Sequence, residues 1–228
     1  NRMRVHKVQV LDPSKLTRKS TNFLVPLEVI CRYYVAGSLW DRVRSGEVKP
    51  SKLGFKGNKD IKYGDELPEP FVEVTTKLEE HDRLLTKTEA MKMASVSVDE
   101  YKAMIDSVTQ IDERIADEVG KRDLIHVDGK QEFAFDENRE LMVVDTFGTA
   151  DEDRWWDDTA YSKGEFVELS KELVRQYYRE KGYYSKLTEA RKQGRPEPKI
   201  PALPADKIKK VSDLYVDMFE RITGESYR

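Results

Sequence analysis

Apolar and polar positions alternate along two stretches in the first third of the chain. In Leu27–Val35 every second residue is apolar or cysteine, and Glu28 and Arg32 fall together on the other side. Phe71–Lys77 alternates in the same way, and Met3–Val10 does so more briefly. A period of two residues is typical of a β-strand. We therefore predict strands in these stretches, the first ending at Gly37-Ser38, and a surface loop over the Gly-, Lys- and Pro-rich residues 44–70.

Other segments have the spacing of helices. Ser97-Val98-Asp99-Glu100 is a capping box. Apolar residues then recur every three or four positions up to Gly120, which predicts a long amphipathic helix. A second helix is expected to start at the cap Ser170 and run toward Gly182. A proline-rich connector, 192–204, precedes a last helix over 206–224.

Short strands are expected between the long helix and the second one. They cover Leu124–Val127, Gln131–Phe135 and Leu141–Val144, with a turn at 136–139 that makes the last two a hairpin. Strands mixed with helices in this order indicate an α+β fold.

The composition narrows the class of protein. Charged residues make up 36% of the 228 residues, which is high for a globular domain, but an aromatic content of 10% argues against disorder. The formal net charge is −3, and no polybasic run predicts a nucleic-acid or membrane partner. A single cysteine, Cys31, excludes an internal disulfide, and three scattered histidines give no zinc spacing. No apolar run reaches membrane-spanning length, so we expect a cytoplasmic protein.

The most promising chemistry lies on the predicted hairpin. On a strand, Asp128, Lys130 and Glu132 share a face, and the hairpin can bring Asp145 beside them. Carboxylates with a lysine suit a magnesium-phosphate site, because hard oxygen ligands hold the ion. A solvated strand face with cross-strand ion pairs is the alternative, and from spacing alone it is the commoner arrangement.

A second candidate is the acidic loop that carries Arg154. Asp151, Glu152 and Asp153 precede this arginine, and Trp155-Trp156 follows it. Such an arginine can clamp a phosphate or carboxylate with two hydrogen bonds. A surface ion-pair loop anchored by a tryptophan is the alternative, and base rates favour it.

Several segments, taken in order, resemble the SAICAR synthetase (phosphoribosylaminoimidazole-succinocarboxamide synthase) family. The matching segments are PLEVICRYYVAGSLW at 26–40, EPFVEVTTKLEEHDRLL at 69–85, VDGKQEF at 127–133, VVDTFGTADEDRWWDD at 143–158, LSKELVRQYY at 169–178 and FERITG at 219–224. Each match is weak alone, but together they follow the family order from Val25 to Gly224.

The resemblance implies an ATP-dependent ligase that joins carboxyaminoimidazole ribonucleotide to L-aspartate in purine biosynthesis. It implies ATP and Mg²⁺ as cofactors and a two-lobed ATP-binding fold. By resemblance, Glu132 and Asp145 bind the metal, Leu24 and Glu28 lie at the adenine and ribose, and Asp128, Lys130 and Arg154 are catalytic. The residues implied at the substrates are Arg32, Ser38 and Arg154 for the ribonucleotide, and Lys77, Asp82, Asp128, Lys130, Asp151, Lys171 and Arg175 for the substrate and aspartate pocket.

The chain departs from the family pattern at three places. Thr146 follows Asp145 where the family has a second carboxylate, and Ala150 replaces a proline before Asp151. The glycine-rich loop of the N-terminal lobe is not found. We therefore expect residues 1–24 to be the remainder of the N-terminal β-rich lobe and 25–228 to be the C-terminal lobe, with an N-terminal part absent from this sequence.

Two other functions stay open at the level of sequence. One is a small-molecule kinase with a similar nucleotide cleft, and the other is a non-catalytic interaction module. The expected partners are the small-molecule substrates, with a homo-oligomer possible and no nucleic acid or membrane.

Overall fold

The computed structural model describes residues 5–57 and 60–227. By its contacts, the chain divides into two compact units. The first comprises residues 1–116 and 127–148, and the second comprises 117–126 and 149–228. The predicted lobe boundary at 24/25 falls inside a strand of the first unit, and the assignment of residues to the family's two lobes stays a prediction.

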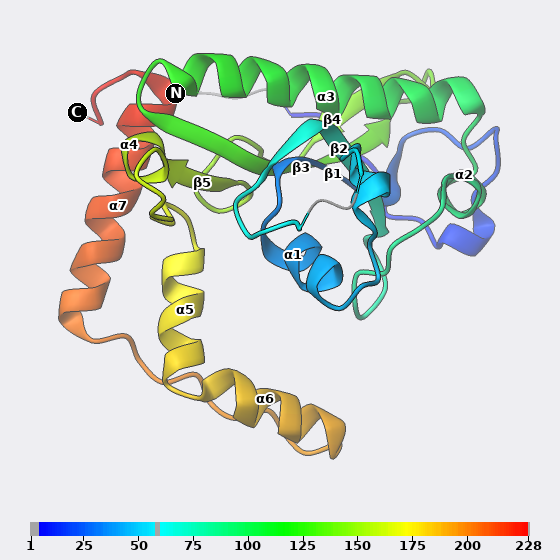
Figure 1. Cartoon of the computed structure of the whole chain (residues 1–228). Coiled ribbons are helices and arrows are strands. Elements are labelled where there is room, and N and C mark those ends of the chain that lie inside the picture. The colour runs from blue at the N-terminus through cyan, green and yellow to red at the C-terminus, as the bar shows by residue number, and fades with distance from the viewer. Residues whose placement is uncertain (1–4, 58–59, 228) are drawn as a thin grey trace. The chain divides into compact units, whose positions relative to one another are not determined.

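An antiparallel sheet forms the centre of the first unit (Figure 1). Its strand order is β2-β1-β3-β4, so β1 is an inner strand with a neighbour on each side. The strands are β1 (Phe23–Tyr34), β2 (Glu66–Thr76), β3 (Leu124–Phe135) and β4 (Leu141–Val144). A fifth strand, β5 (Arg154–Asp157), pairs with β3, whose residues 124–126 belong to the second unit.

One face of this sheet carries the core of the first unit. Val29 and Cys31 of β1 pack with Met104 and Val108 of α3 (Val98–Gly120), which lies along the sheet in Figure 1. The capping box predicted before this helix is present, since the Ser97 hydroxyl accepts from the Glu100 amide while the Glu100 carboxylate accepts from the Ser97 amide. Burial raises the pKa of the Cys31 thiol to about 12. The predicted strand and helix are therefore confirmed.

The prediction of a surface loop over 44–70 is only partly correct: many of its described residues are exposed, but its last residues belong to β2 and several apolar side chains are buried. Leu53, Phe55 and Ile61 in this segment are buried and form a second core cluster with Val35 and Leu39. This cluster packs around α1 (Gly37–Arg44), η2 (Pro50–Leu53) and the start of β2. The composition concealed these contacts, because the apolar residues are scattered among glycines, lysines and prolines without a period of two or of 3.6.

One more local prediction needs correction, and one helix was not predicted. Residues 5–10 form no strand and only a single bridge, Gln9 to Phe23, while residues 1–4 lie outside the described part of the chain. A short helix that we did not predict, α2 (Lys87–Ala94), starts at a Thr86 capping box. The remaining short element near the N-terminus is η1 (Pro13–Lys15).

The second unit contains the helices α4 (Asp158–Tyr161), α5 (Glu172–Glu180), α6 (Tyr183–Lys192) and α7 (Ala205–Thr223). The expected helix after Ser170 is present, and Gly182 ends it in a left-handed conformation, with φ +70°. The proline-rich connector returns from α6 to α7 (Figure 1), and the hydroxyls of Tyr178 and Tyr183 donate to its carbonyls. No helix in the described part of the chain is long and apolar enough to cross a membrane.

Two arginines fasten the end of α7 to the turn before β3. The Arg122 guanidinium donates to the carbonyls of Arg221 and Ile222. In return, Arg221 donates to the carbonyls of Arg122 and Asp123 and to the Asp157 carboxylate. Cations at a helix C-terminus satisfy carbonyls that have no partner within the helix.

We predict that Arg139 stabilises the first unit more than any other residue of the β3–β4 turn. Its guanidinium contacts Glu100 at 2.7 Å, donates to the Ser95 and Ser20 carbonyls, and lies 4.8 Å from the ring centroid of Phe135. Arg139→Ala should lower the free energy of unfolding by about 3 kcal/mol, because it leaves the half-buried Glu100 carboxylate without its cation and the two carbonyls without this donor.

The measurement is urea denaturation followed by far-UV circular dichroism. Glu137→Ala in the same turn is the control, because its side chain is 60% exposed and its one ion pair among the described residues is with His6. Equal midpoints for the two variants would contradict the prediction.

Candidate active site

The polar face of the sheet, opposite the core, collects the predicted residues of the first unit. In the register of the strands, Glu28 of β1 lies directly across from Glu132 of β3, and Arg32 lies across from Asp128. Directly paired residues place their side chains on the same face. Lys130 lies between its two β3 neighbours on this face, opposite Ile30. The shared face predicted for residues 128, 130 and 132 is therefore confirmed.

Two glutamates and two lysines form the first of two charge clusters on this face. The Lys130 ammonium is 3.0 Å from Glu28 Oε1 and 3.4 Å from Glu132 Oε1. The Lys77 ammonium is 2.5 Å from Glu132 Oε2 and 3.9 Å from Glu28 Oε1. Glu132 is the most buried of the four, with its side chain 5% exposed. The formal charges cancel, which offsets much of the cost of removing these groups from water.

The pKa of Glu28 is raised above its ordinary value. Partial burial is the largest cause, and the charges of Asp82 and Glu132 add to it, while the hydrogen bond from Lys130 acts in the opposite direction. Asp82 itself is exposed, in the segment after β2. Its influence on Glu28 indicates that this predicted residue lies near the first cluster.

Arg32 is the centre of the second charge cluster. Its guanidinium donates from Nε to Glu73 at 2.9 Å, from Nη1 to Asp128 at 3.3 Å and from Nη2 to the Ser38 hydroxyl at 3.2 Å. Arg42 reaches the same Glu73 oxygen at 2.6 Å. The structure thus brings together Arg32, Ser38 and Asp128, as the resemblance implies. Sequence reasoning missed Arg42 and gave no role to Glu73.

The loop before α1 places Ser38 beside Arg32. Gly37 takes a positive φ of +51°, which few other residues adopt without strain, and α1 begins there. The residue before it, Ala36, offers no side-chain cap, so the first amides of α1 have no side-chain partner there. The exposed Ser38 hydroxyl and the Arg32 guanidinium therefore lie together at a helix N-terminus, where backbone N–H groups favour anions.

Asp145 does not lie at the end of a buried strand. β4 is only partly buried, and Asp145 is exposed just beyond it, with a φ of +65°. Its carboxylate accepts from the Thr146 amide at 2.8 Å. The left-handed conformation of Asp145 ends the alternation of side chains between the two faces of the sheet. The pairing of Glu132 with Val144 therefore does not fix the face of the sheet on which the Asp145 side chain lies. Leu24 lies on β1, half-buried opposite Ala134.

The second unit holds the remaining predicted residues. Arg154 Nη1 lies 3.5 Å from Glu168 Oε1, and the same oxygen accepts from the Trp156 indole at 3.0 Å. Asp151, which is exposed, accepts from the Tyr215 hydroxyl of α7. Arg154 and Asp151 are thus each held by a partner that sequence spacing did not predict.

Lys171 and Arg175 lie one turn apart at the start of α5, as predicted. The Arg175 amide bonds to the Lys171 carbonyl, which fixes their common side of the helix. Glu172 lies 3.7 Å from Arg175 and also accepts from Arg179, so part of the local positive charge is compensated. No ion pair of Lys171 occurs within the described residues. The N-cap of α5 is Lys171, one residue after the predicted cap Ser170. The Ser170 hydroxyl still accepts from the Glu172 amide.

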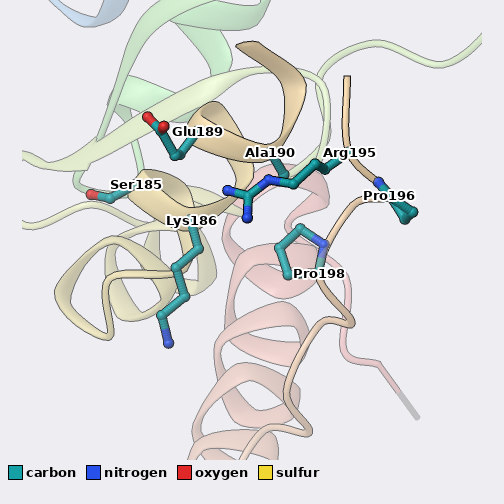
Figure 2. Close-up of a pocket in the computed structure, with 7 residues that line it drawn as sticks. All are labelled: Ser185, Lys186, Glu189, Ala190, Arg195, Pro196 and Pro198. Carbon is teal, nitrogen blue, oxygen red and sulfur yellow. The ribbon is translucent and has the colours of Figure 1, made fainter. Parts of the chain in front are cut away.

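A surface pocket of the second unit contains none of the predicted residues. Figure 2 shows side chains of α6 and of the connector around it. Its lining residues are Ser185, Lys186, Glu189, Ala190, Arg195, Pro196 and Pro198.

Within residues 5–57 and 60–227, no group of three or more histidines, cysteines or acidic residues has the arrangement of a metal site.

We predict that the charge on Glu28 lowers stability at neutral pH. A carboxyl whose pKa is raised on folding contributes stability below its ordinary pKa of 4.5, and this contribution is lost as the pH rises through the folded pKa. The free energy of unfolding of wild type should therefore fall relative to that of Glu28→Gln between about pH 4 and pH 7. Urea denaturation across this range measures the difference, and a constant difference would contradict the prediction.

Comparisons with known proteins agree with the resemblance seen in the sequence. A model of the SAICAR synthetase family matches residues 1–190. The phosphoribosylaminoimidazole-succinocarboxamide synthase of Thermoplasma volcanium is 55% identical over 225 residues, which cover 99% of this chain and 75% of that protein. The protein of that name in Saccharomyces cerevisiae is 29% identical, with 97% of this chain and 68% of that protein covered.

Solved structures with the same fold come from this family. A SAICAR synthetase in complex with ADP superposes with a TM-score of 0.61 at 28% identity, over 90% of this chain and 66% of that chain. The Saccharomyces cerevisiae SAICAR synthase complexed with SAICAR has a TM-score of 0.66 at 26% identity, over 90% of this chain and 62% of that chain. With its α+β fold, its ordered motifs and these relatives, the chain belongs to the SAICAR synthetase family.

Proposed function

We propose that this protein joins carboxyaminoimidazole ribonucleotide to L-aspartate with ATP, giving SAICAR, ADP and phosphate in de novo purine biosynthesis. The observation that carries the proposal is the polar face of the sheet. There the family's motif residues from three strands meet in two compensated charge clusters. A relative solved with ADP and another solved with SAICAR support the same chemistry.

The two charge clusters suit different parts of this reaction. An amide-forming ligase that consumes ATP must activate a carboxylate and stabilise the charge of the transferred phosphoryl group. Lys77 and Lys130 would face that charge, oriented by the glutamates that pair with them. Arg32 and Ser38 would bind the phosphate of the ribonucleotide at the start of α1. Asp128 would keep Arg32 in place.

The nucleotide would lie at Leu24 and Glu28, next to the first cluster. Mg²⁺ belongs to the proposal through its chemistry, since Glu132 and Asp145 supply the hard oxygen donors that it prefers. Both Glu132 oxygens already contact lysines, so the ion would share this carboxylate with a lysine or take the place of one. Bound there, Mg²⁺ would neutralise phosphate charge.

The second unit would contribute side chains that bind anionic substrates. Lys171 at the first turn of α5 and Arg175 one turn later suit a carboxylate, because the helix N-terminus adds backbone N–H groups. Arg154 would contact the ribonucleotide, and Asp151 would accept from the aspartate amine. A cytoplasmic location and a possible homo-oligomer remain predictions.

The test of the proposal is an assay of the purified protein with ATP, Mg²⁺ and the ribonucleotide, with aspartate varied. We expect amide product and ADP in equal amounts, both dependent on aspartate, and loss of turnover when EDTA removes the ion. ADP release that needs the ribonucleotide but no amine would instead identify a kinase. The absence of ATP binding by calorimetry would indicate a non-catalytic module.

We further predict that Lys171→Ala weakens the binding of aspartate. Loss of a charge-assisted hydrogen bond should raise KM for aspartate about 10- to 100-fold, with little change in melting temperature. Steady-state kinetics at saturating ATP and ribonucleotide measures this effect. Lys181→Ala is the matched control, because Lys181 is exposed at the opposite end of α5. An unchanged KM with a lower melting temperature would make Lys171 a structural residue.

A further inference from the structure

We infer that Arg42 is a second arginine of the site that binds the ribonucleotide phosphate. The inference rests on the proposed function, which assigns that phosphate to Arg32 and Ser38. The family resemblance assigned no role to Arg42. The fold places this residue at the site through its contact with Glu73.

The first observation is the convergence of two arginines on one carboxylate oxygen. Arg32 Nε and Arg42 Nη2 lie 2.9 and 2.6 Å from the same oxygen of Glu73. One carboxylate therefore holds two guanidiniums that would otherwise repel each other. With Asp128, which contacts Arg32, the cluster is formally neutral, so an anion would bind here by taking the place of a carboxylate partner on one or both guanidiniums.

The second observation is the position of Arg42 on α1. Arg42 follows Ser38 by one helical turn, and its Nε lies 3.4 Å from the Ser38 carbonyl oxygen. The two residues therefore share one side of α1, with the Ser38 hydroxyl held by Arg32. An anion that accepts from the Ser38 hydroxyl would lie beside both guanidiniums.

The third observation is the number of donors that Arg42 has to spare. A guanidinium has five N–H donors. In Arg42 the Nε donor contacts the Ser38 carbonyl and one Nη2 donor contacts Glu73, so these two contacts use two of the five. The Arg42 side chain is 14% exposed, twice the 7% of Arg32. Arg42 is thus the more accessible of the two arginines, and Glu73 is a positioning residue that orients both.

The test compares Arg42→Ala with Arg44→Ala. Arg44 lies on the same helix but is 69% exposed, and within the part of the chain that the structure describes its one ion pair is with Asp41, three residues before it. Arg42→Ala should raise KM for the ribonucleotide about 10- to 100-fold while leaving KM for ATP and aspartate within about twofold. Arg44→Ala should leave all three unchanged. Arg42→Lys should recover part of the loss, since it keeps the charge but not the planar fork.

A second measurement separates contact with the phosphate from a role in holding α1. Inorganic phosphate and ribose 5-phosphate are used as competitive inhibitors of wild type and of Arg42→Ala. We expect the variant to lose about the same factor in affinity for both inhibitors as for the ribonucleotide, and to bind the dephosphorylated ribonucleoside as wild type does. A structural role would affect nucleoside and nucleotide equally.

The outcomes also separate this inference from the proposed function. If wild type makes no amide from the ribonucleotide and aspartate, the proposed function fails. If wild type is active and Arg42→Ala keeps its KM for the ribonucleotide, or loses affinity equally for nucleoside and nucleotide, only the inference about Arg42 is wrong.

Discussion

The structure of the first unit depends on one constraint: the inner strand β1 is apolar on one face and charged on the other. The apolar face closes the core against α3. The charged face is nearly as inaccessible, since the Glu28 and Arg32 side chains are 11% and 7% exposed. A charge in such surroundings is costly unless it is paired. The neighbouring strands supply the partners, Lys130 and Asp128 from β3 and Glu73 from β2.

This pairing also determines how ligands can bind. In each cluster the formal charges cancel: two glutamates with two lysines, and two arginines with Glu73 and Asp128. A charged ligand therefore binds by replacing one side chain of an existing ion pair as the partner of the other. Such a site discriminates by geometry, because an anion that fits poorly leaves a buried charge without its original partner.

Much of this arrangement could be predicted from the sequence, because alternation is a local property. The period of two in β1 and around Lys130 gave the correct faces, and ordered motifs gave the family. The partners could not be predicted in the same way. The contact between Arg32 and Glu73 depends on the register of β1 with β2, which includes an irregularity near Tyr34. Arg42 belongs to a helix that residue spacing did not indicate.

The wrong predictions have physical causes of the same kind. A few apolar side chains of the segment 44–70, such as Leu53, Phe55 and Ile61, are buried by packing around α1, and they need no regular spacing to do so. Asp145 lies after a strand, but its left-handed backbone ends the alternation on which the argument relied. Tyr215, which holds Asp151, is 64 residues away in the sequence. Such contacts between distant segments leave no signal in one sequence.

The arginine contacts between the turn before β3 and the end of α7 have a consequence for the order of folding. They join residues about 100 positions apart, so the chain between them must be closed into a large loop before they can form. Local helices such as α5 and α6 can form before that closure, whereas these contacts depend on it. During synthesis, residues 117–126 therefore leave the ribosome long before their partners exist. The second unit is expected to complete its folding late, and proteolysis of nascent chains would be most effective in that interval.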